Sequence, residues 1–438
     1  MKRILSVFLV FLLLCFSGCL DEEKSNPPVE ANGSQAPARL DGRTENEPLA
    51  ERSGARSENL FGGSLLTKQL LKEAVAVPDG YLLVNNGIEK YDRTGELLWH
   101  KTYPFFSDDA ATSLLVSIAP LSDNAFAFSY DLQNFYDENN TLVVTDTVLA
   151  KCDKDGNLLW QYTFEKYSDQ VVESVFQTDS GNIVTIGSAW YGSNLEHEFT
   201  SIYLSLLSPD GKLLKTVHYG GSDFDWVSAA DYVSGVGLVA LLTSQSTDGT
   251  FSVSSDGSGF DILALIDDDL KIKWFKALGQ FLFSDSLLAT EKAIYLLDTQ
   301  NNYYKLDYSG NILFQASIAE NAVSTHLVGA SPGGPVLQIA ETLAFYQDLT
   351  QVQTIYFDGG NASDILMTED GFVIVSTRVT GQLPTPPILS SLWYSSELVY
   401  SGYNPNGTLL WRKTQDITPQ AWYDYDPDDW NTKSNGGL

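Results

Sequence analysis

Aspartate residues recur at one place in the sequence, just before short apolar segments with the alternating pattern of β-strands. A ring of carboxylates can bind a cation or a basic group, and two suitably spaced carboxylates can hydrolyse a glycosidic bond. The same side chains can instead accept hydrogen bonds from nearby backbone N–H groups. Repetition favours this capping role, because a structural role recurs and a site need not. The residues are Asp109, Asp169, Asp225, Asp285 and Asp364.

Aromatic residues gather in the longer connections between the apolar segments. Flat amphipathic rings suit stacking on sugars or gripping peptides at low entropic cost. The alternative is that these rings pack against each other and hold the connections down. The candidate binding residues are Phe135, Tyr136, Trp190, Tyr191, Phe251, Trp393 and Tyr394.

Metal motifs are incomplete. Asp153, Asp155 and Asn157 have the alternate spacing of a calcium loop, but the other ligands of such a loop are absent, so a hairpin turn explains them better. The run of aspartates at 267–269 has the same explanation. The acidic aromatic run at 422–430 could bind a cation weakly. We predict no cofactor and leave a bound Ca²⁺ as the one alternative.

Motifs for catalysis are missing. The chain has four histidines, and none has the spacing of a zinc site. It has no nucleophile elbow, phosphate-binding glycine loop or dinucleotide fingerprint. We therefore predict a protein that is not an enzyme, with catalysis by the recurring aspartates as the alternative.

The N-terminus indicates export. Lys2 and Arg3 precede an apolar run from residue 4 to 16, which is typical of a signal peptide. The small residues before Cys19 resemble a lipoprotein cleavage box, so we expect signal cleavage after residue 18 and lipidation of Cys19. Plain secretion is the alternative, with Cys15 an ordinary residue of the apolar run. The protein would then be extracytoplasmic and anchored to the membrane or cell surface.

Composition divides the rest of the chain. Residues 19–59 are rich in Pro, Ala, Ser, Glu and Asn, and they predict a disordered tether because they offer little apolar surface to bury. Residues 60–415 form the folded body, and 416–438 an acidic aromatic tail. Cys152 is the body's single cysteine, so we expect a small buried side chain rather than a disulfide.

The charge balance excludes one class of partner. The chain has 26 Lys and Arg against 56 Asp and Glu, a formal net charge of −30. Nucleic acid binding needs a basic surface, so we do not expect a nucleic acid partner.

Two turn motifs alternate along the body and predict its fold. The first is an acidic or Asn-containing turn followed by a strand that often ends in Trp. Its copies are 91–99, 152–160, 207–215, 266–274, 306–314, 346–354 and 403–411. The second is an earlier hairpin turn and strand, at 78–84, 122–128, 179–187, 234–242, 290–297, 332–339 and 369–375.

Two hairpins per unit make four strands per unit, and such a sheet cannot bury both faces alone. We predict an all-β fold, a seven-bladed β-propeller of four-stranded antiparallel blades. With strands A to D counted from the axis outward, the first motif joins C to D and the second joins A to B. The B–C and D–A connections share the other face, and the B–C connections of blades 2, 3, 4 and 7 are long.

The strands with spacing D-x-x-G-x-x-x-W resemble the repeats of PQQ-like propellers, and the segments 219–226 and 261–274 resemble SBBP-type repeats. The resemblance covers residues 60 to 415 and implies a propeller repeat lipoprotein. The adjacent cysteines of alcohol-oxidising quinoproteins are absent, so no bound quinone is predicted.

The expected function is a non-catalytic, monomeric binding or scaffold module that presents its long loops to a protein or glycan partner. Loops longer than a turn requires are where binding usually occurs. On a propeller the recurring aspartates would converge near the mouth of the central channel. The alternative is a surface polysaccharide hydrolase or lyase that uses these carboxylates.

Overall fold

The computed structural model describes a β-structure within residues 74–416. The described stretches are 74–84, 87–103, 114–132, 146–164, 170–191, 199–252, 259–279, 283–318, 325–331, 334–339, 341–347, 350–357, 360–368, 371–383 and 393–416. For some residues in these strands only the backbone is described. The expected signal peptide, the tether with Cys19, and residues 417–438 lie outside the described stretches.

The described strands form seven antiparallel sheets, each built from four consecutive strands. The inner strands are β1 (Ala74–Val77), β5 (Leu114–Pro120), β9 (Gln170–Gln177), β13 (Asp225–Val233), β17 (Phe283–Ala289), β21 (Thr325–Ser331) and β25 (Asn361–Thr368). The second strands are β2 (Gly80–Val84), β6 (Phe126–Leu132), β10 (Ile183–Tyr191), β14 (Gly237–Ser244), β18 (Ile294–Asp298), β22 (Gly334–Ile339) and β26 (Gly371–Leu383).

The third strands are β3 (Ile88–Asp92), β7 (Asp146–Cys152), β11 (Phe199–Leu207), β15 (Phe260–Ile266), β19 (Asn302–Leu306), β23 (Thr342–Gln347) and β27 (Trp393–Tyr403). The outer strands are β4 (Leu97–Lys101), β8 (Leu158–Thr163), β12 (Leu213–Tyr219), β16 (Ile272–Gly279), β20 (Ile312–Ser317), β24 (Thr350–Tyr356) and β28 (Leu409–Asp416).

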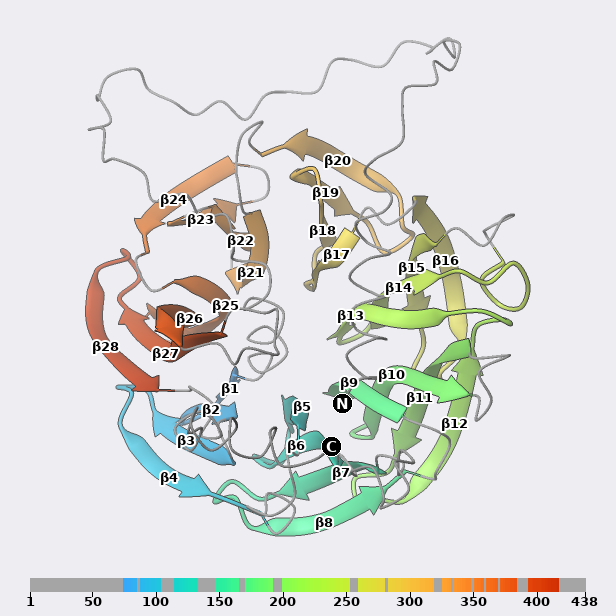
Figure 1. Ribbon diagram of the computed structural model, residues 1–438, viewed down its shortest axis with the longest axis horizontal. Helices are drawn as coiled ribbons and strands as arrows, with labels where there is room; N and C mark the ends of the chain where they lie inside the picture. Colours follow the sequence, from blue (N-terminus) through green and yellow to red (C-terminus); the bar gives the residue numbers. More distant parts are fainter. Residues whose placement is uncertain are drawn as a thin grey trace, which may run out of the picture. The chain divides into compact units, whose positions relative to one another are not determined.

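The sheets are the blades of a closed ring. Successive inner strands contact one another, and β25 of the last blade contacts β1 of the first. The inner strands surround the axis and the outer strands form the perimeter (Figure 1). The fold is a seven-bladed β-propeller, so the prediction from the repeated turns is confirmed.

Burial follows the position of a strand in its blade. Every residue of β14 is buried, because the neighbouring blades cover both of its faces. The outer strand β12 alternates between half-buried and exposed residues, because one of its faces is open to solvent. All the exposed large hydrophobic side chains among the described residues lie on outer strands.

The turn between the third and outer strands is held by its first side chain. In blade 2, Asp153 Oδ1 accepts hydrogen bonds from the backbone N–H groups of Asp155 and Asn157, at 2.9 and 2.8 Å. Gly156 adopts a φ of 76°, which favours glycine. In blade 4 this position is Leu270, with a φ of 60°. The hairpin-turn explanation of Asp153, Asp155 and Asn157 is therefore confirmed.

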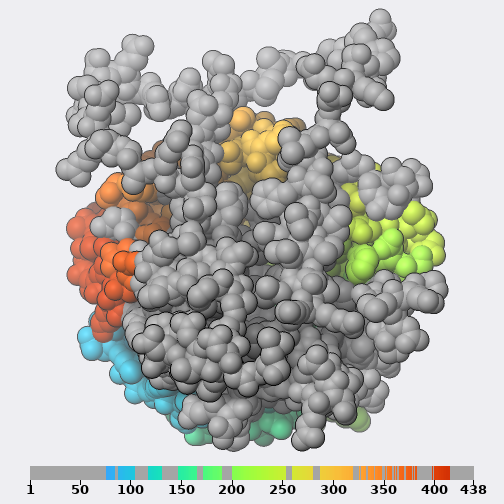
Figure 2. Space-filling view, viewed as in Figure 1, coloured from blue at the N-terminus to red at the C-terminus, as the bar shows by residue number. Residues whose placement is uncertain are grey.

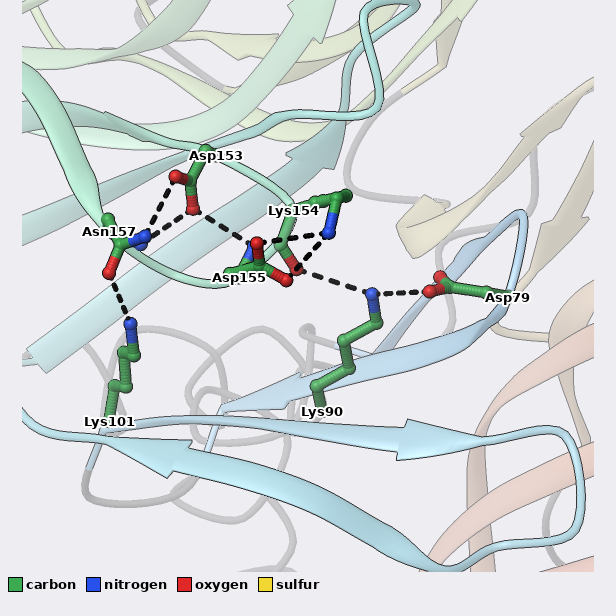
Figure 3. Close-up of polar contacts among 7 residues, drawn as sticks. All are labelled: Asp79, Lys90, Lys101, Asp153, Lys154, Asp155 and Asn157. Carbon is green, nitrogen blue, oxygen red and sulfur yellow. Dashed lines mark hydrogen bonds and ion pairs between the residues drawn. The ribbon is translucent and has the colours of Figure 1, made fainter.

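The C–D turn of blade 2 also receives the outer strand of the preceding blade. The ring of Trp99 packs on Gly156, where an added Cβ would lie 2.9 Å from the indole. Lys101 Nζ donates a hydrogen bond to Asn157 Oδ1 at 2.7 Å (Figure 3). Similar Trp–Gly contacts join Trp160 to Gly211, Trp274 to Gly310, and Trp411 to Gly95. The repeated tryptophan is thus an inter-blade contact.

Apolar clusters between blades form the core. Cys152 is fully buried in the cluster shared by blades 1 and 2, beside Leu82 and Phe128. Its Sγ–H donates to the hydroxyl of Tyr103, and burial raises the pKa of the thiol to about 11. The expectation of a small buried side chain at Cys152 is confirmed.

Candidate functional site

The two faces of the propeller differ in their connections. The A–B and C–D turns lie on one face, which we call the turn face. The B–C and D–A connections lie on the other, which we call the loop face. Strand bounds place the long B–C connections at residues 133–145, 192–198, 245–259 and 384–392, in blades 2, 3, 4 and 7. This distribution is the one expected from the sequence.

Two hairpins extend far at the loop face. In blade 3, β10 and β11 stay paired as far as Tyr191 opposite Phe199. In blade 7, β26 and β27 stay paired as far as Leu383 opposite Trp393. Trp190 and Tyr191 therefore end one hairpin strand, and Trp393 and Tyr394 begin another. Their backbones are described and their side chains are not. Phe135 and Tyr136 lie outside the described residues.

The B–C loop of blade 4 is fastened to the D–A connection before it. Gln245 N donates to Phe224 O at 2.8 Å, and Thr250 N donates to Gly220 O at 2.9 Å. In the opposite direction, Ser222 N donates to Asp248 Oδ1 at 2.7 Å. These bonds in both directions fix the course of the described part of the loop.

Phe251 anchors that loop. It is fully buried in the core cluster of blades 3 and 4. Its ring centroid lies 5.2 Å from that of Phe275 in an edge-on arrangement and 6.4 Å from that of Tyr219. For this residue the packing alternative describes the geometry, because a side chain with no exposed surface offers nothing to a ligand.

Asp225 is the one recurring aspartate whose side chain the structure describes. It is fully buried at the start of β13. Its Oδ2 accepts hydrogen bonds from Gly221 N and from the hydroxyl of Ser246, both at 2.8 Å. Burial raises the pKa of Asp225, and these hydrogen bonds oppose the rise. Asp225 therefore caps its own connection and is closed to a substrate or a solvated cation.

The structure describes less of the other recurring aspartates. Asp285 and Asp364 lie in inner strands β17 and β25, where only their backbone is described. Asp109 and Asp169 lie outside the described residues. The carboxylate ring at the channel mouth therefore stays a prediction for these four positions.

Asp231 is a carboxylate that the sequence analysis missed. It lies on inner strand β13, and its Oδ2 accepts a hydrogen bond from the backbone N–H of Ala289 in blade 5 at 2.8 Å. Part of the residue reaches solvent, but protein atoms enclose the carboxyl group, and this burial raises its pKa to about 7. The signal that could have identified it was an acidic residue within an inner strand, whereas the recurring aspartates were predicted to precede those strands.

Charge is sorted along the radius of the propeller. The seven inner strands contain acidic residues and no Lys or Arg: Glu173, Asp225, Asp231, Asp285 and Asp364. The outer strands contain one carboxylate, Asp416, against six basic residues, Lys101, Lys215, Lys273, Lys276, Arg412 and Lys413. Acidic residues thus lie on the inner strands of the described blades, and basic residues predominate on the outer strands.

The turn face has a cavity of about 210 Å³ between blades 1 and 2, lined in part by Leu82, Phe126 and Lys90. The side chain of Lys90 is 5% exposed, and its Nζ bonds to Asp79 Oδ2 at 2.8 Å and to Lys154 O at 3.3 Å (Figure 3). Burial disfavours ionised Asp79, but the hydrogen bond and charge of Lys90 outweigh it and lower the pKa of Asp79.

The same bridge recurs in the next blade. Lys151 Nζ bonds to Asp123 Oδ2 at 2.7 Å and to Pro209 O at 3.5 Å. Each buried lysine thus connects its own A–B turn to the C–D turn of the following blade. The repetition assigns Lys90 and Lys151 a structural role and leaves the cavity without a polar group dedicated to a ligand.

Within the described stretches, no three His, Cys, Asp or Glu side chains come together in a way that could hold a metal ion. Nor do those stretches contain a helix with the length and apolar character needed to cross a membrane.

No family model matches the chain, and no curated protein matches it. Solved structures that align with it include BamB from Moraxella catarrhalis, at 10% identity, with 70% of this chain and 94% of that chain covered and a TM-score of 0.41. The Dos1 propeller aligns at 13% identity, over 67% of this chain and 72% of that chain, with a TM-score of 0.42. BBS1N, solved in complex with ARL6DN, aligns at 8% identity over 78% and 88% of the two chains, with a TM-score of 0.39.

Proposed function

We propose that this protein is a non-catalytic binding or scaffold module that presents its loop face to a protein or glycan partner. In this proposal a lipid on Cys19 holds it outside the cytoplasm, and the tether keeps the propeller away from the membrane. The signal-like N-terminus and the small residues before Cys19 support the anchor.

One observation carries the proposal of binding at the loop face. Two hairpins there extend well beyond the need of a connection, and each bears a Trp–Tyr pair near its end: Trp190 and Tyr191, and Trp393 and Tyr394. On the turn face, by contrast, side chains such as Asp153 and Lys90 are already engaged in turns and inter-blade bridges. Aromatic side chains carried on hydrogen-bonded strands suit recognition, because less conformational entropy is lost on binding than for residues of an unpaired loop.

Asp225 is relevant to the alternative of a polysaccharide hydrolase or lyase. That mechanism needs two accessible carboxyl groups roughly 5 to 10 Å apart. Asp225 is fully buried and hydrogen-bonded, so it does not supply either of them. The alternative would then depend on Asp109, Asp169, Asp285 and Asp364.

A glycan and peptide array tests the proposal. The probe is the full chain with Cys19→Ser, which prevents lipidation, beside a Trp190→Ala, Trp393→Ala double variant. The matched control is Leu159→Ala, which removes a 54% exposed apolar side chain from the perimeter. Binding that the double variant loses and the control keeps supports the loop face. Equal binding by all three proteins, or no binding to any probe, counts against it.

Membrane anchoring is tested separately. The wild-type chain is expressed in a bacterial host with lipoprotein processing, and the mass of its N-terminal peptide is measured. The expected result is a diacylglyceryl group on Cys19 in the wild type and an unmodified, secreted product for Cys19→Ser. An unmodified Cys19 in the mature wild type would remove the anchor and leave the binding proposal standing.

A further inference from the structure

The junction between blades 7 and 1 differs from the other junctions of the ring. Each of the others is crossed by the chain, as where residues 280–282 lead from β16 to β17. The chain begins its first described strand at Ala74 in blade 1 and ends its last at Asp416 in blade 7. Each described sheet uses its own four strands, so no described strand of one blade completes the other. The two blades lie side by side, red beside blue, in both views (Figures 1 and 2).

Among the described residues, side-chain contacts hold this junction together. Its core is a cluster of buried residues from both blades: Tyr81, Leu83 and Tyr91 from blade 1, with Leu366, Val373, Val375 and Tyr400 from blade 7. At the perimeter, Trp411 packs on Gly95, where an added Cβ would lie 2.7 Å from the indole ring. Lys413 Nζ bonds to Gly95 O and lies 3.0 Å from Glu96 Oε1.

Tyrosines make this core more polar than an aliphatic one. The ring centroids of Tyr81 and Tyr91 are 5.3 Å apart, and that of Tyr400 lies 5.6 Å from Tyr91. The hydroxyl of Tyr91 donates to Glu89 Oε2 at 2.6 Å. The hydroxyls of Tyr81 and Tyr400 are buried with no hydrogen-bond partner among the described residues. A buried hydroxyl without a partner favours any state in which water can reach it.

We propose that the ring opens and recloses at the junction of blades 7 and 1, and that Trp411 and Lys413 form its latch. Loss of these contacts separates the two blades without stretching any described part of the backbone, whereas a chain segment limits separation at every other junction. Opening hydrates the hydroxyls of Tyr81 and Tyr400 and gives access from the perimeter toward the acidic axis. A partner that binds the open form better than the closed form would increase its population. This device goes beyond the proposed loop-face binding and does not depend on it.

Thiol labelling of buried positions measures the opening. Backbone hydrogen bonds remain within each blade as the junction opens, so amide exchange would miss it. Val375→Cys places a thiol in the junction core, at a side chain that is 1% exposed. The matched control is Val184→Cys, at a 2% exposed valine in the cluster of blades 3 and 4, whose junction the chain crosses.

Labelling is followed on the full chain, with each site quantified by mass spectrometry, and native Cys152 serves as an internal control in blades 1 and 2. If the junction opens locally, the thiol of Val375→Cys reacts at least about tenfold faster than that of Val184→Cys. Equal rates at the two sites would mean that both thiols are exposed by global unfolding, and would overturn the proposal.

The latch is tested by adding Trp411→Ala to both labelled variants, with Trp160→Ala as the matched change at the junction of blades 2 and 3. Trp411→Ala is expected to speed labelling at the Val375→Cys site by about tenfold and to leave the Val184→Cys site nearly unchanged. Trp160→Ala is expected to have no selective effect on the Val375→Cys site. An equal effect of Trp411→Ala at both sites contradicts the latch.

Tyr400→Phe tests the polar core and keeps the experiment decisive if Trp411→Ala fails to fold. It removes a buried hydroxyl that has no partner among the described residues and retains the ring. It should therefore favour the closed state and slow labelling at the Val375→Cys site by about threefold or more. Labelling that becomes faster would contradict the assigned role of this hydroxyl.

Discussion

Aspartates in this protein differ in pKa according to their surroundings. Asp307 is half-buried at the C–D turn of blade 5, where its Oδ1 accepts hydrogen bonds from the backbone N–H groups of Asn311 and Ser309, both at 2.9 Å. These bonds favour the ionised form and lower the pKa of Asp307. Asp231, enclosed near the axis, has a raised pKa because burial disfavours its charge. Residue type alone therefore does not indicate the role of a carboxylate here.

Asp231→Asn should change how stability depends on pH. An aspartate ordinarily has a pKa of 3.8, whereas the pKa of Asp231 in the folded protein is about 7. The folded state therefore binds the proton more tightly than the unfolded state does. The free energy of unfolding should therefore fall as pH rises from about 4 to about 7, and level off above. Urea unfolding across this range should show that fall in the wild type and a smaller one in Asp231→Asn. Parallel profiles for the two proteins would contradict the assignment.

Phe251→Ala should be strongly destabilising. The ring is fully buried against Phe275 and Tyr219, and its removal leaves a cavity that costs about 3–5 kcal/mol of unfolding free energy. Leu159→Ala is the control, since a 54% exposed side chain should change stability by about 0.5 kcal/mol or less. Chemical denaturation measures both values. A Phe251→Ala protein as stable as the control would mean that the ring does not anchor its loop.

At the scale of elements, one turn performs two tasks. The side chain at its first position fixes the hairpin, and the glycine at its fourth receives the tryptophan of the preceding blade. In blade 4, Leu270 occupies the glycine position with a φ of 60°, yet it is 1% exposed within the core. Burial of that leucine offsets the cost of its backbone conformation, which is of the order of 1–2 kcal/mol. This degenerate repeat thus keeps the turn because burial of the leucine side chain compensates for the unfavourable backbone conformation.

A pair of glycine substitutions separates the strain of the positive-φ backbone from the contact with the tryptophan. Gly156→Ala and Gly235→Ala act at nearly equal φ angles, 76° and 75°. A Cβ on Gly156 would lie 2.9 Å from Trp99, whereas a Cβ on Gly235 would have nothing within 4 Å. Both should lose about 1 kcal/mol to backbone strain, and Gly156→Ala about 1–3 kcal/mol more from the clash with the indole. Equal losses in urea unfolding would show that the tryptophan yields freely.

At the scale of the whole molecule, net charge opposes compaction. The chain carries a formal charge of −30, and folding brings the carboxylates closer together. Ion pairs offset little of this, because several of those described, such as Lys154 with Asp155, are largely exposed. The more deeply buried pairs of Lys90 and Lys151 connect neighbouring blades and are few.

Added salt should therefore stabilise the propeller at neutral pH. Raising NaCl from about 0.1 to about 1 M shortens the Debye length from about 10 Å to about 3 Å and screens the repulsion. The expected result is a rise of a few degrees in Tm by calorimetry. Near pH 4.3, the isoelectric point of the sequence, the same change should have much less effect. A Tm that falls with salt at neutral pH would mean that attractive ion pairs dominate.

Much of the architecture could be predicted from local sequence. A turn such as residues 153–157 needs an acceptor side chain at its start and a residue that tolerates positive φ near its end. Both residue types can be identified in the amino-acid sequence. Seven alternating copies of two such turns determine the number of strands per blade and the number of blades. The spacing between copies also located the long B–C connections of blades 2, 3, 4 and 7.

The roles of particular side chains could not be read in this way. Phe251 was a candidate for ligand binding, yet it is fully buried. For Asp225 the repetition favoured a capping role, and the hydrogen bonds of its buried carboxylate fit that role. No sequence pattern marked Asp231, and the spacing of the tryptophans predicted only the ends of strands. Burial and pKa depend on which distant segments arrive beside a residue, as the N–H of Ala289 does at Asp231, and spacing along the chain carries no such information.

The amino-acid order by itself determined the all-β character, the blade count and the sorting of short and long connections between two faces, because turns and alternation are local properties of the backbone. Only the tertiary structure decided that the first and last blades share none of the described strands, and that Trp411 of the last blade packs on Gly95 of the first. That closure depends on side chains more than three hundred positions apart, such as Lys413 and Gly95. Their meeting follows from the accumulated angle between seven blades and not from any local pattern.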